Sequence, residues 1–337
     1  MKNKYIAILL CSGFLIAGLI AAFITYFGGY YHQHMEENEA VCPDANAVRN
    51  GEWVVFDTTG ENNHFRNYVF TNLAGDICGN VPVTKYATDG RGNSVQMAET
   101  PAGALDERAE YIFAVYPKNP DDSSESRLNT FGIYQHYIKS CGSVNLIYPD
   151  NAGEKAKEEI EDEISYFEKT IYSYDFNKTG DFIDKERFIR FYIITEVAVP
   201  QFSDEMPLYI FKNEDGRYEP FAAGFMTDSQ NPESDFSLTF SYLYTMLFKD
   251  KDFVDGVVNE YRALREDELS DESLDDYITR AVGFIEKYYS TGKSIENEEK
   301  ELRNYIKKRL SWMDDNIESL YQYCARSSIK HFSDEPY

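Results

Sequence analysis

Residues 175–186 carry oxygen-bearing side chains at spacings that could bind Ca²⁺. The segment reads DFNKTGDFIDKE and fits the twelve-residue loop of an EF-hand, with Gly180 at the position of the sharp turn. The ligands would be Asp175, Asn177, Thr179, Asp181 and Glu186. The alternative interpretation needs no metal: Gly180 closes a turn, Asp184 caps the next helix, and Glu186 lies in its first turn.

Glu196 is a second candidate for chemistry. It follows the apolar run FYIIT, which predicts a partly buried carboxylate, either catalytic or held in a structural ion pair. Other reaction classes lack their motifs, since the chain contains no H-x-x-x-H pair and no G-x-S-x-G. The glycine-rich stretch DGRGN at 89–93 lacks the context of a phosphate loop and predicts a hairpin turn.

The elements around these residues are predicted from local patterns. Residues 154–174 form an amphipathic helix with Ile160, Ile164, Phe167 and Ile171 on one face. A tight loop, an apolar helix and a hairpin with its turn at 213–216 follow. Four more helices are expected after residue 236, the last with an apolar stripe of Leu302, Ile306, Leu310, Met313, Ile317 and Leu320.

Before residue 150 the pattern is mixed. WVVF at 53–56 and YIFAVYP at 111–117 read as strands, and residues 81–99 as a hairpin. FRNYVFTNLAGDI begins a helix that Gly75 and Gly79 are expected to break.

The charge balance excludes nucleic acid as a partner. The chain has 58 acidic and 33 basic residues, a formal charge of −25, whereas binding to phosphates needs an excess of Lys and Arg. Its 27 Tyr and 23 Phe indicate a folded core rather than a disordered chain.

The N-terminus predicts a membrane anchor. Residues 5–27 carry no charge, enough to cross a hydrocarbon core of ~30 Å, with Lys2 and Lys4 before them and acidic residues after them. This asymmetry predicts a single-pass protein of the cell membrane with a cytoplasmic N-terminus and the bulk of the chain outside. We divide the chain into an anchor at 1–31, a polar stalk at 32–50, a strand-containing region at 51–150 and a helical region at 151–330.

Four cysteines lie beyond the predicted anchor, at Cys42, Cys78, Cys141 and Cys324. An oxidising compartment permits two disulfides among them, in any of three pairings, or free thiols.

Several segments together resemble the spore coat protein H (CotH) family of atypical protein kinases. The similar stretches are LIYPDNAGEKAKEEIEDEISYFEKTIYS, DFIDKERFIRFYIITE, EYRALREDELSDESLDDYI, YIKKRLSWMDDNI and, earlier, HFRNYVFTNLAGDI. The resemblance implies an α+β, kinase-like fold with a reduced N-terminal lobe and a mostly helical C-terminal lobe, after the transmembrane helix. It also implies ATP and Mg²⁺ as cofactors if the chain is active.

The polar residues of the family pattern are mostly changed. Alignment on Glu196 places Pro200 and Phe202 at the Asn and Asp of the family's N-x-D. The family's WDFD motif contains two Asp residues. In this chain the second of these positions is Asp228, and the first is Met226. If catalysis survives, the residues that could carry it are Asp228, with Mg²⁺, and Glu196 or Asp204.

Three functions are therefore open. The first is a membrane-anchored, extracytoplasmic pseudokinase-type module that binds a partner with little or no phosphotransfer. The second is an active kinase that phosphorylates exported or surface proteins. The third is a calcium-stabilised adhesion or scaffold domain around residues 175–186.

Overall fold

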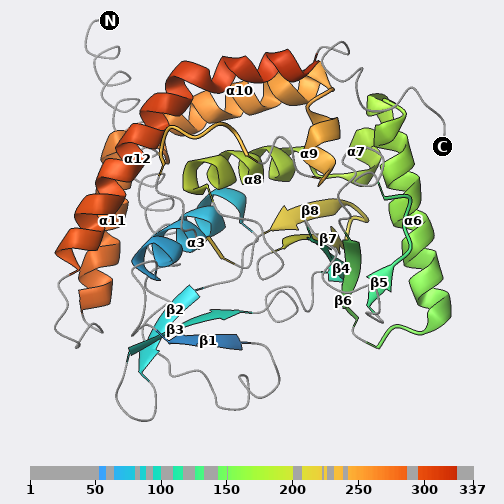
Figure 1. The fold of residues 1–337 in the computed structure, drawn as a ribbon, viewed down its shortest axis with the longest axis horizontal. Coiled ribbons are helices and arrows are strands. Elements are labelled where there is room, and N and C mark those ends of the chain that lie inside the picture. Colours follow the sequence, from blue (N-terminus) through green and yellow to red (C-terminus); the bar gives the residue numbers. More distant parts are fainter. Residues whose placement is uncertain are drawn as a thin grey trace, which may run out of the picture. The chain divides into compact units, whose positions relative to one another are not determined.

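The computed structural model describes thirteen stretches of the chain between residues 53 and 324. They are residues 53–57, 64–79, 84–88, 94–99, 109–116, 126–132, 143–149, 151–199, 207–221, 224–225, 231–237, 242–286 and 295–324. All of them belong to one compact unit, Pro43–Tyr337. They form an α+β fold with two antiparallel sheets and a set of helices (Figure 1).

The larger sheet has five strands in the order β5-β6-β4-β7-β8. Its central strand β4 is buried from Tyr111 to Val115, which explains the unbroken apolar run in the sequence. The sheet contains strands from both sides of residue 150, where the sequence analysis divided the chain. Strand β4 pairs with β6, which precedes this position, and with β7, which follows it. The strands are β4 (Ala109–Tyr116), β5 (Arg127–Leu128), β6 (Ser143–Tyr148), β7 (Leu208–Asn213) and β8 (Tyr218–Phe221).

The predicted hairpin at 213–216 is confirmed. β7 pairs with β8, and Gly216 has φ +78°, a left-handed conformation that glycine adopts without steric cost. Asn213 fixes the turn through its side chain, since its Oδ1 accepts from the backbone N–H of Arg217 at 2.9 Å.

The smaller sheet has three strands in the order β1-β3-β2: β1 (Trp53–Asp57), β2 (Thr84–Thr88) and β3 (Ser94–Glu99). β2 and β3 form the predicted hairpin. Between β1 and β2 lies α3 (His64–Cys78), which runs through Gly75. The prediction that Gly75 breaks the helix is therefore wrong. The helix ends at Gly79, which has φ +73° and closes it as a left-handed cap.

Helices make up most of the chain after residue 150. Those expected from the sequence are present, and the predicted apolar stripes of the first and last long helices are buried. The elements are α6 (Glu154–Tyr172), η1 (Phe176–Lys178), α7 (Thr179–Phe182), α8 (Lys185–Ala198), α9 (Tyr242–Leu247), α10 (Lys251–Glu266), α11 (Asp271–Glu286), α12 (Glu296–Asn316) and η3 (Ile317–Cys324).

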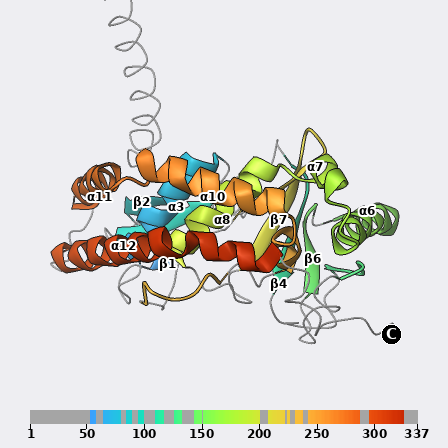
Figure 2. The same ribbon diagram turned by 90° about the horizontal axis from the view of Figure 1, so that it is seen from above.

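Helix α8 is the centre of the core. Every residue from Phe191 to Val199 is buried, because α3, α10, α12 and β8 all pack against this helix. Figure 1 shows α8 between α3 and α10, and Figure 2 shows the long helix α12 running across α8 and α3. This burial explains why the run from Phe191 to Ala198 is mostly apolar, whereas the first turns of α8 keep charged residues that are not buried, at Lys185, Glu186, Arg187 and Arg190.

The predicted anchor at residues 5–27 lies outside the described residues. Among the helices that are described, none is long and apolar enough to cross a membrane. Cys78 and Cys324 carry free thiols, whereas Cys42 and Cys141 lie outside the described part of the chain.

Candidate functional site

The C-terminal end of α8 is held by three side chains from other helices. An α-helix leaves its last carbonyl groups without internal partners, and its negative end favours cations. Here Arg309 Nε, Tyr305 OH and Arg66 Nη2 donate to three successive carbonyls at 2.7, 3.3 and 2.7 Å. The accepting carbonyls belong to Glu196, Val197 and Ala198.

Glu196 and Arg309 form an ion pair in the core. Arg309 Nη2 lies 3.2 Å from Glu196 Oε2, and both side chains are 0 % exposed. Ser237 donates its backbone N–H to Glu196 Oε2 at 3.1 Å and its hydroxyl to Oε1 at 3.5 Å. Burial lowers the pKa of Arg309, and the carboxylate of Glu196 opposes this shift. The carboxylate therefore has the partners and burial of a structural group, one of the two interpretations that the sequence left open.

Arg309 has no spare donor direction toward solvent. Besides Glu196, its guanidinium donates to the carbonyls of Pro232 and Ser234, and it stacks at 4.6 Å on Trp312. One arginine thus ties α12, α8 and the segment 231–237 together, and the extensive hydrogen bonding offsets part of the cost of its burial.

Two adjacent residues of α3 form hydrogen bonds to the backbone of two segments far along the chain, at Ala198 and at Phe225. Arg66 binds the carbonyl of Ala198, where α8 leads to the segment that contains Asp204. Asn67 Oδ1 accepts from the backbone N–H of Phe225 at 2.7 Å, three residues before Asp228. The sequence marked the pair Arg66 and Asn67 only as a family match. Their anchoring contacts span more than 130 residues, so no local signal could have shown them.

The other residues of the predicted kinase site lie outside the described residues. These are Asp204, Asp228, Pro200, Phe202 and Met226.

The calcium candidate adopts helical structure. Residues 176–178 form the 3-10 helix η1 and 179–182 form α7, so the segment is two short helical turns before α8. Asp175 pairs with Lys178 at 2.6 Å, and Glu186 pairs with Arg190 at 3.2 Å. Thr179 is buried, Asn177 lies in η1 and Asp181 in α7.

No three His, Cys, Asp or Glu side chains among the described residues gather to hold a metal ion. Asp184 instead accepts from the backbone N–H of Arg187 at 3.1 Å and caps α8, as the alternative interpretation predicted. Calcium binding stays a prediction.

Lys212 of β7 links the large sheet to α6. Its amine lies 2.7 Å from Glu163 and 2.9 Å from Glu110. Tyr111 OH donates to Glu163 at 3.1 Å and lies 2.6 Å from Tyr218 OH. Burial is the main cause that raises the pKa of both tyrosines, so they stay neutral and hydrogen-bonded.

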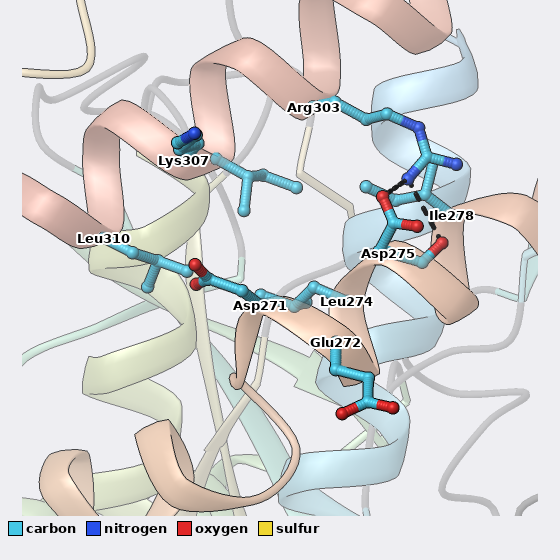
Figure 3. A pocket seen from close by; sticks show the side chains of 9 residues that line it. Asp271, Glu272, Leu274, Asp275, Ile278, Arg303, Lys307 and Leu310 are labelled. Carbon is cyan, nitrogen blue, oxygen red and sulfur yellow. Dashed lines mark hydrogen bonds and ion pairs between the residues drawn. The ribbon is translucent and has the colours of Figure 1, made fainter.

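A groove of about 450 Å³ lies between α11 and α12 (Figure 3). Its apolar lining consists of Leu274, Ile278, Ile306 and Leu310. Asp271, Glu272 and Asp275 of α11 line one side, and Arg303 and Lys307 of α12 the other. Arg303 bonds to Asp275 and bridges the two helices, as the dashed lines in the figure show. The lining side chains offer no nucleophile paired with a base, so the groove has no catalytic arrangement.

Residues from two of the segments that resemble the family, in α10 and α12, contact each other. Arg265 of α10 binds both carboxylate oxygens of Asp314 in α12, at 3.1 and 3.3 Å, and Tyr261 OH donates to the same group at 2.7 Å. With the pair of Glu196 and Arg309, these contacts fix α12 against α10 and α8.

A comparison with models of protein families finds a match over the second half of the fold. The family model described as "CotH kinase protein" matches residues 140–313, just over half of the chain. A comparison with curated proteins finds no match. The match spans β6 to α12, including the hairpin and the buried ion pair, and begins after α3. The chain belongs to the CotH kinase protein family.

Proposed function

We propose that this CotH-family protein is a pseudokinase-type binding module that transfers phosphoryl groups poorly or not at all. The observation that supports the proposal is Glu196. Among the three carboxylates that the family alignment singles out, Glu196 is the one that lies in the described residues. Its side chain is 0 % exposed, and both of its carboxylate oxygens accept hydrogen bonds, from Arg309 and from Ser237. A general base must reach the proton of its substrate, and a buried, paired carboxylate does not.

The substitutions around it point the same way. Phosphoryl transfer needs acidic residues that hold Mg²⁺ and an Asp that orients the attacking hydroxyl. The aligned positions contain Phe202 and Met226, whose side chains offer no oxygen for a hard cation. Asp228 keeps one carboxylate of the family's pair. The residues thus fit the scaffold of the family better than they fit its magnesium chemistry.

The test is incorporation of labelled phosphate from ATP, with Mg²⁺ or Mn²⁺, into the protein itself and into added acceptor proteins. We expect the wild type to match Asp228→Ala, at background. The matched gain-of-function variant is Phe202→Asp with Met226→Asp, which restores both acidic positions. Incorporation by the wild type that Asp228→Ala abolishes would show an active kinase and overturn the proposal.

We further propose that the predicted helix at residues 5–27 anchors this module outside the cytoplasm. The support is the charge asymmetry, with Lys2 and Lys4 before the helix and acidic residues after it. Protease added to intact cells should then remove the folded domain, and protection of the domain until the cells are lysed would contradict this orientation.

A further inference from the structure

The groove between α11 and α12 has an apolar bottom and a charged rim. Its volume of about 450 Å³ lies in the range of ~300–1,000 Å³ that is usual for ligand clefts. Figure 3 shows that the lining side chains come from two neighbouring helices, so the groove is a slot between them. Such a slot accepts apolar side chains that a third helix presents on one face. The apolar side chains of the lining, each at most 4 % exposed, are Leu274, Ile278, Ile306 and Leu310.

The α11 side of the groove carries an excess of negative charge. Asp271 is paired with Arg265 at 3.2 Å, and Asp275 is paired with Arg303. Glu272 is exposed and has no ion-pair partner among the described residues. The stretch from residue 266 to residue 276 contains no basic residue, and its acidic residues are Glu266, Asp267, Glu268, Asp271, Glu272, Asp275 and Asp276.

The α12 side contributes two cations to the lining, and one of them is already paired. Arg303 binds Asp275 and also Glu299, the latter at 2.8 Å. Lys307 is exposed and forms no ion pair within the part of the chain that the structure describes. On the α11 side Asp276 lies one helical turn after Glu272 and is likewise exposed and unpaired among the residues described. A cationic ligand can therefore reach carboxylates on α11 without displacing an existing ion pair.

The charge pattern selects the ligand class. The carboxylates of residues 266–276 repel an anionic membrane surface or a nucleic acid. A second copy of the chain brings the same formal charge of −25, whereas surfaces of opposite charge favour association. A small uncharged apolar molecule would leave the acidic rim without a partner. A helix with apolar residues on one face and Lys or Arg beside them matches both the bottom and the rim.

We propose that the groove between α11 and α12 is the docking site of a cationic amphipathic helix from a partner protein. Its apolar side chains, spaced by three and four residues, enter the slot between Ile278 and Ile306. Lys or Arg on its flank lies against Glu272 and Asp276, and Lys307 marks the opposite edge, where a cation is disfavoured. The site uses none of the residues aligned with the family's catalytic groups, so docking there does not depend on phosphate transfer.

The experiment measures binding of a model peptide to the full-length protein in nanodiscs of phosphatidylcholine, which carries no net charge. The probe is a fluorescein-labelled peptide of about 18 Leu and Lys residues, with Leu at i, i+3, i+4 and i+7. We expect its fluorescence anisotropy to rise saturably with protein concentration, after subtraction of empty nanodiscs. A peptide of the same composition in scrambled order should bind about tenfold more weakly, and a Leu/Glu peptide with the original pattern should not bind.

Substitutions at exposed positions locate the site without disturbing the core. Glu272→Gln with Asp276→Asn should weaken binding by about three- to tenfold, because two carboxylates of the rim are lost. Lys307→Glu should strengthen binding by about threefold, because it extends the negative charge to the second wall. Glu158→Gln with Asp162→Asn, on the exposed face of α6, is the matched control and should leave the affinity unchanged.

Hydrogen exchange gives a second readout, since the bound peptide should protect backbone amides of α11 and α12 and leave those of α6 unchanged. Three results would each overturn the site: equal binding of the patterned and scrambled peptides, equal affinity of the α11 and α6 variants, or protection confined to other elements. Failure of the proposed function is a different result. Phosphate transfer by the wild type that depends on Asp228 would make the protein a kinase, whether or not the peptide binds between α11 and α12.

Discussion

At the scale of single residues, the buried pair of Glu196 and Arg309 sets the stability of the site. Both side chains are 0 % exposed, so removal of one partner leaves an uncompensated charge in the core. We expect Arg309→Met to lower the free energy of unfolding by about 3–5 kcal/mol in urea titrations. Because paired removal leaves no orphan charge, Glu196→Leu with Arg309→Met should recover part of the loss, while the carbonyls that Arg309 binds remain without that donor. A double variant as unstable as the single one would contradict this account.

Lys249 predicts a pH dependence of stability. It is 8 % exposed, donates to the carbonyl of Tyr323 at 2.6 Å, and has no carboxylate partner among the described residues. Burial lowers its pKa to about 8, and the nearby Cys324 opposes the shift. Below pH 8 both folded and unfolded chains carry the charge, and its burial costs stability. Between pH 8 and about 10.5 the folded lysine is neutral while the unfolded one is still charged, so folding becomes more favourable as pH rises.

The variant Lys249→Met removes this dependence and keeps most of the packing. We expect it to exceed the wild type in unfolding free energy by about 1 kcal/mol at pH 7 and to have lost this advantage at pH 9.5, because the wild type gains stability as Lys249 deprotonates in the folded state. Urea titrations at the two pH values measure the difference directly. Lys251→Met, at an exposed position two residues away, is the control and should give the same difference at both pH values. A constant difference for Lys249→Met would show that the lysine does not titrate in this window.

At the scale of elements, α3 and α8 cap each other. Arg66 of α3 covers the C-terminal carbonyl of Ala198, and Arg187 of α8 donates to the carbonyl of Cys78 at the end of α3. Arg190 adds a contact to Ile77 and pairs with Glu260 of α10. Since each helix places cations at the negative end of the other, the antiparallel pairing of the two helices supplies partners that neither has alone.

Two glycines of this pair of helices test the capping. Gly79 has φ +73°, and a Cβ there would lie 2.7 Å from Nη1 of Arg187. We expect Gly79→Ala to destabilise the protein by about 1–2 kcal/mol. Gly75 lies within α3 with nothing within 4 Å of an added Cβ, and Gly75→Ala should stabilise by about 0.5–1 kcal/mol. Equal effects of the two substitutions in thermal unfolding would refute the distinction between helix interior and cap.

Local sequence patterns predicted most helices and strands correctly. They did not predict contacts between residues that are distant in sequence. The stripe from Leu302 to Leu320 and the turn at Gly216 are encoded within a few residues, so their predictions are confirmed. The pairing of β4 with β7 and the ion pair of Glu196 with Arg309 join residues about a hundred positions apart. One sequence contains no signal for such pairs, which is why Glu196 could be recognised as buried while its partner could not be named.

At the scale of the whole molecule, the charge of −25 opposes the compact state. Many of the ion pairs are exposed, such as Lys155 with Glu159, and contribute little. Salt screens repulsion between exposed charges within about 10 Å at 0.1 M ionic strength. We therefore expect the midpoint of thermal unfolding to rise as NaCl increases from about 0.02 to 0.5 M. A falling midpoint would mean that attractive pairs outweigh the repulsion.

The same titration decides whether calcium acts on this protein as a specific ligand. In the structure Asp175 is paired with Lys178 and Glu186 with Arg190, so neither carboxylate is free to bind a cation without breaking an ion pair. We expect CaCl₂ and NaCl of equal ionic strength to raise the midpoint equally, because screening depends on ionic strength alone. A larger rise with CaCl₂ that Asp175→Asn with Glu186→Gln removes would establish a calcium site at residues 175–186. Glu214→Gln with Asp215→Asn, at two exposed positions in the hairpin turn, is the matched control for the loss of two charges.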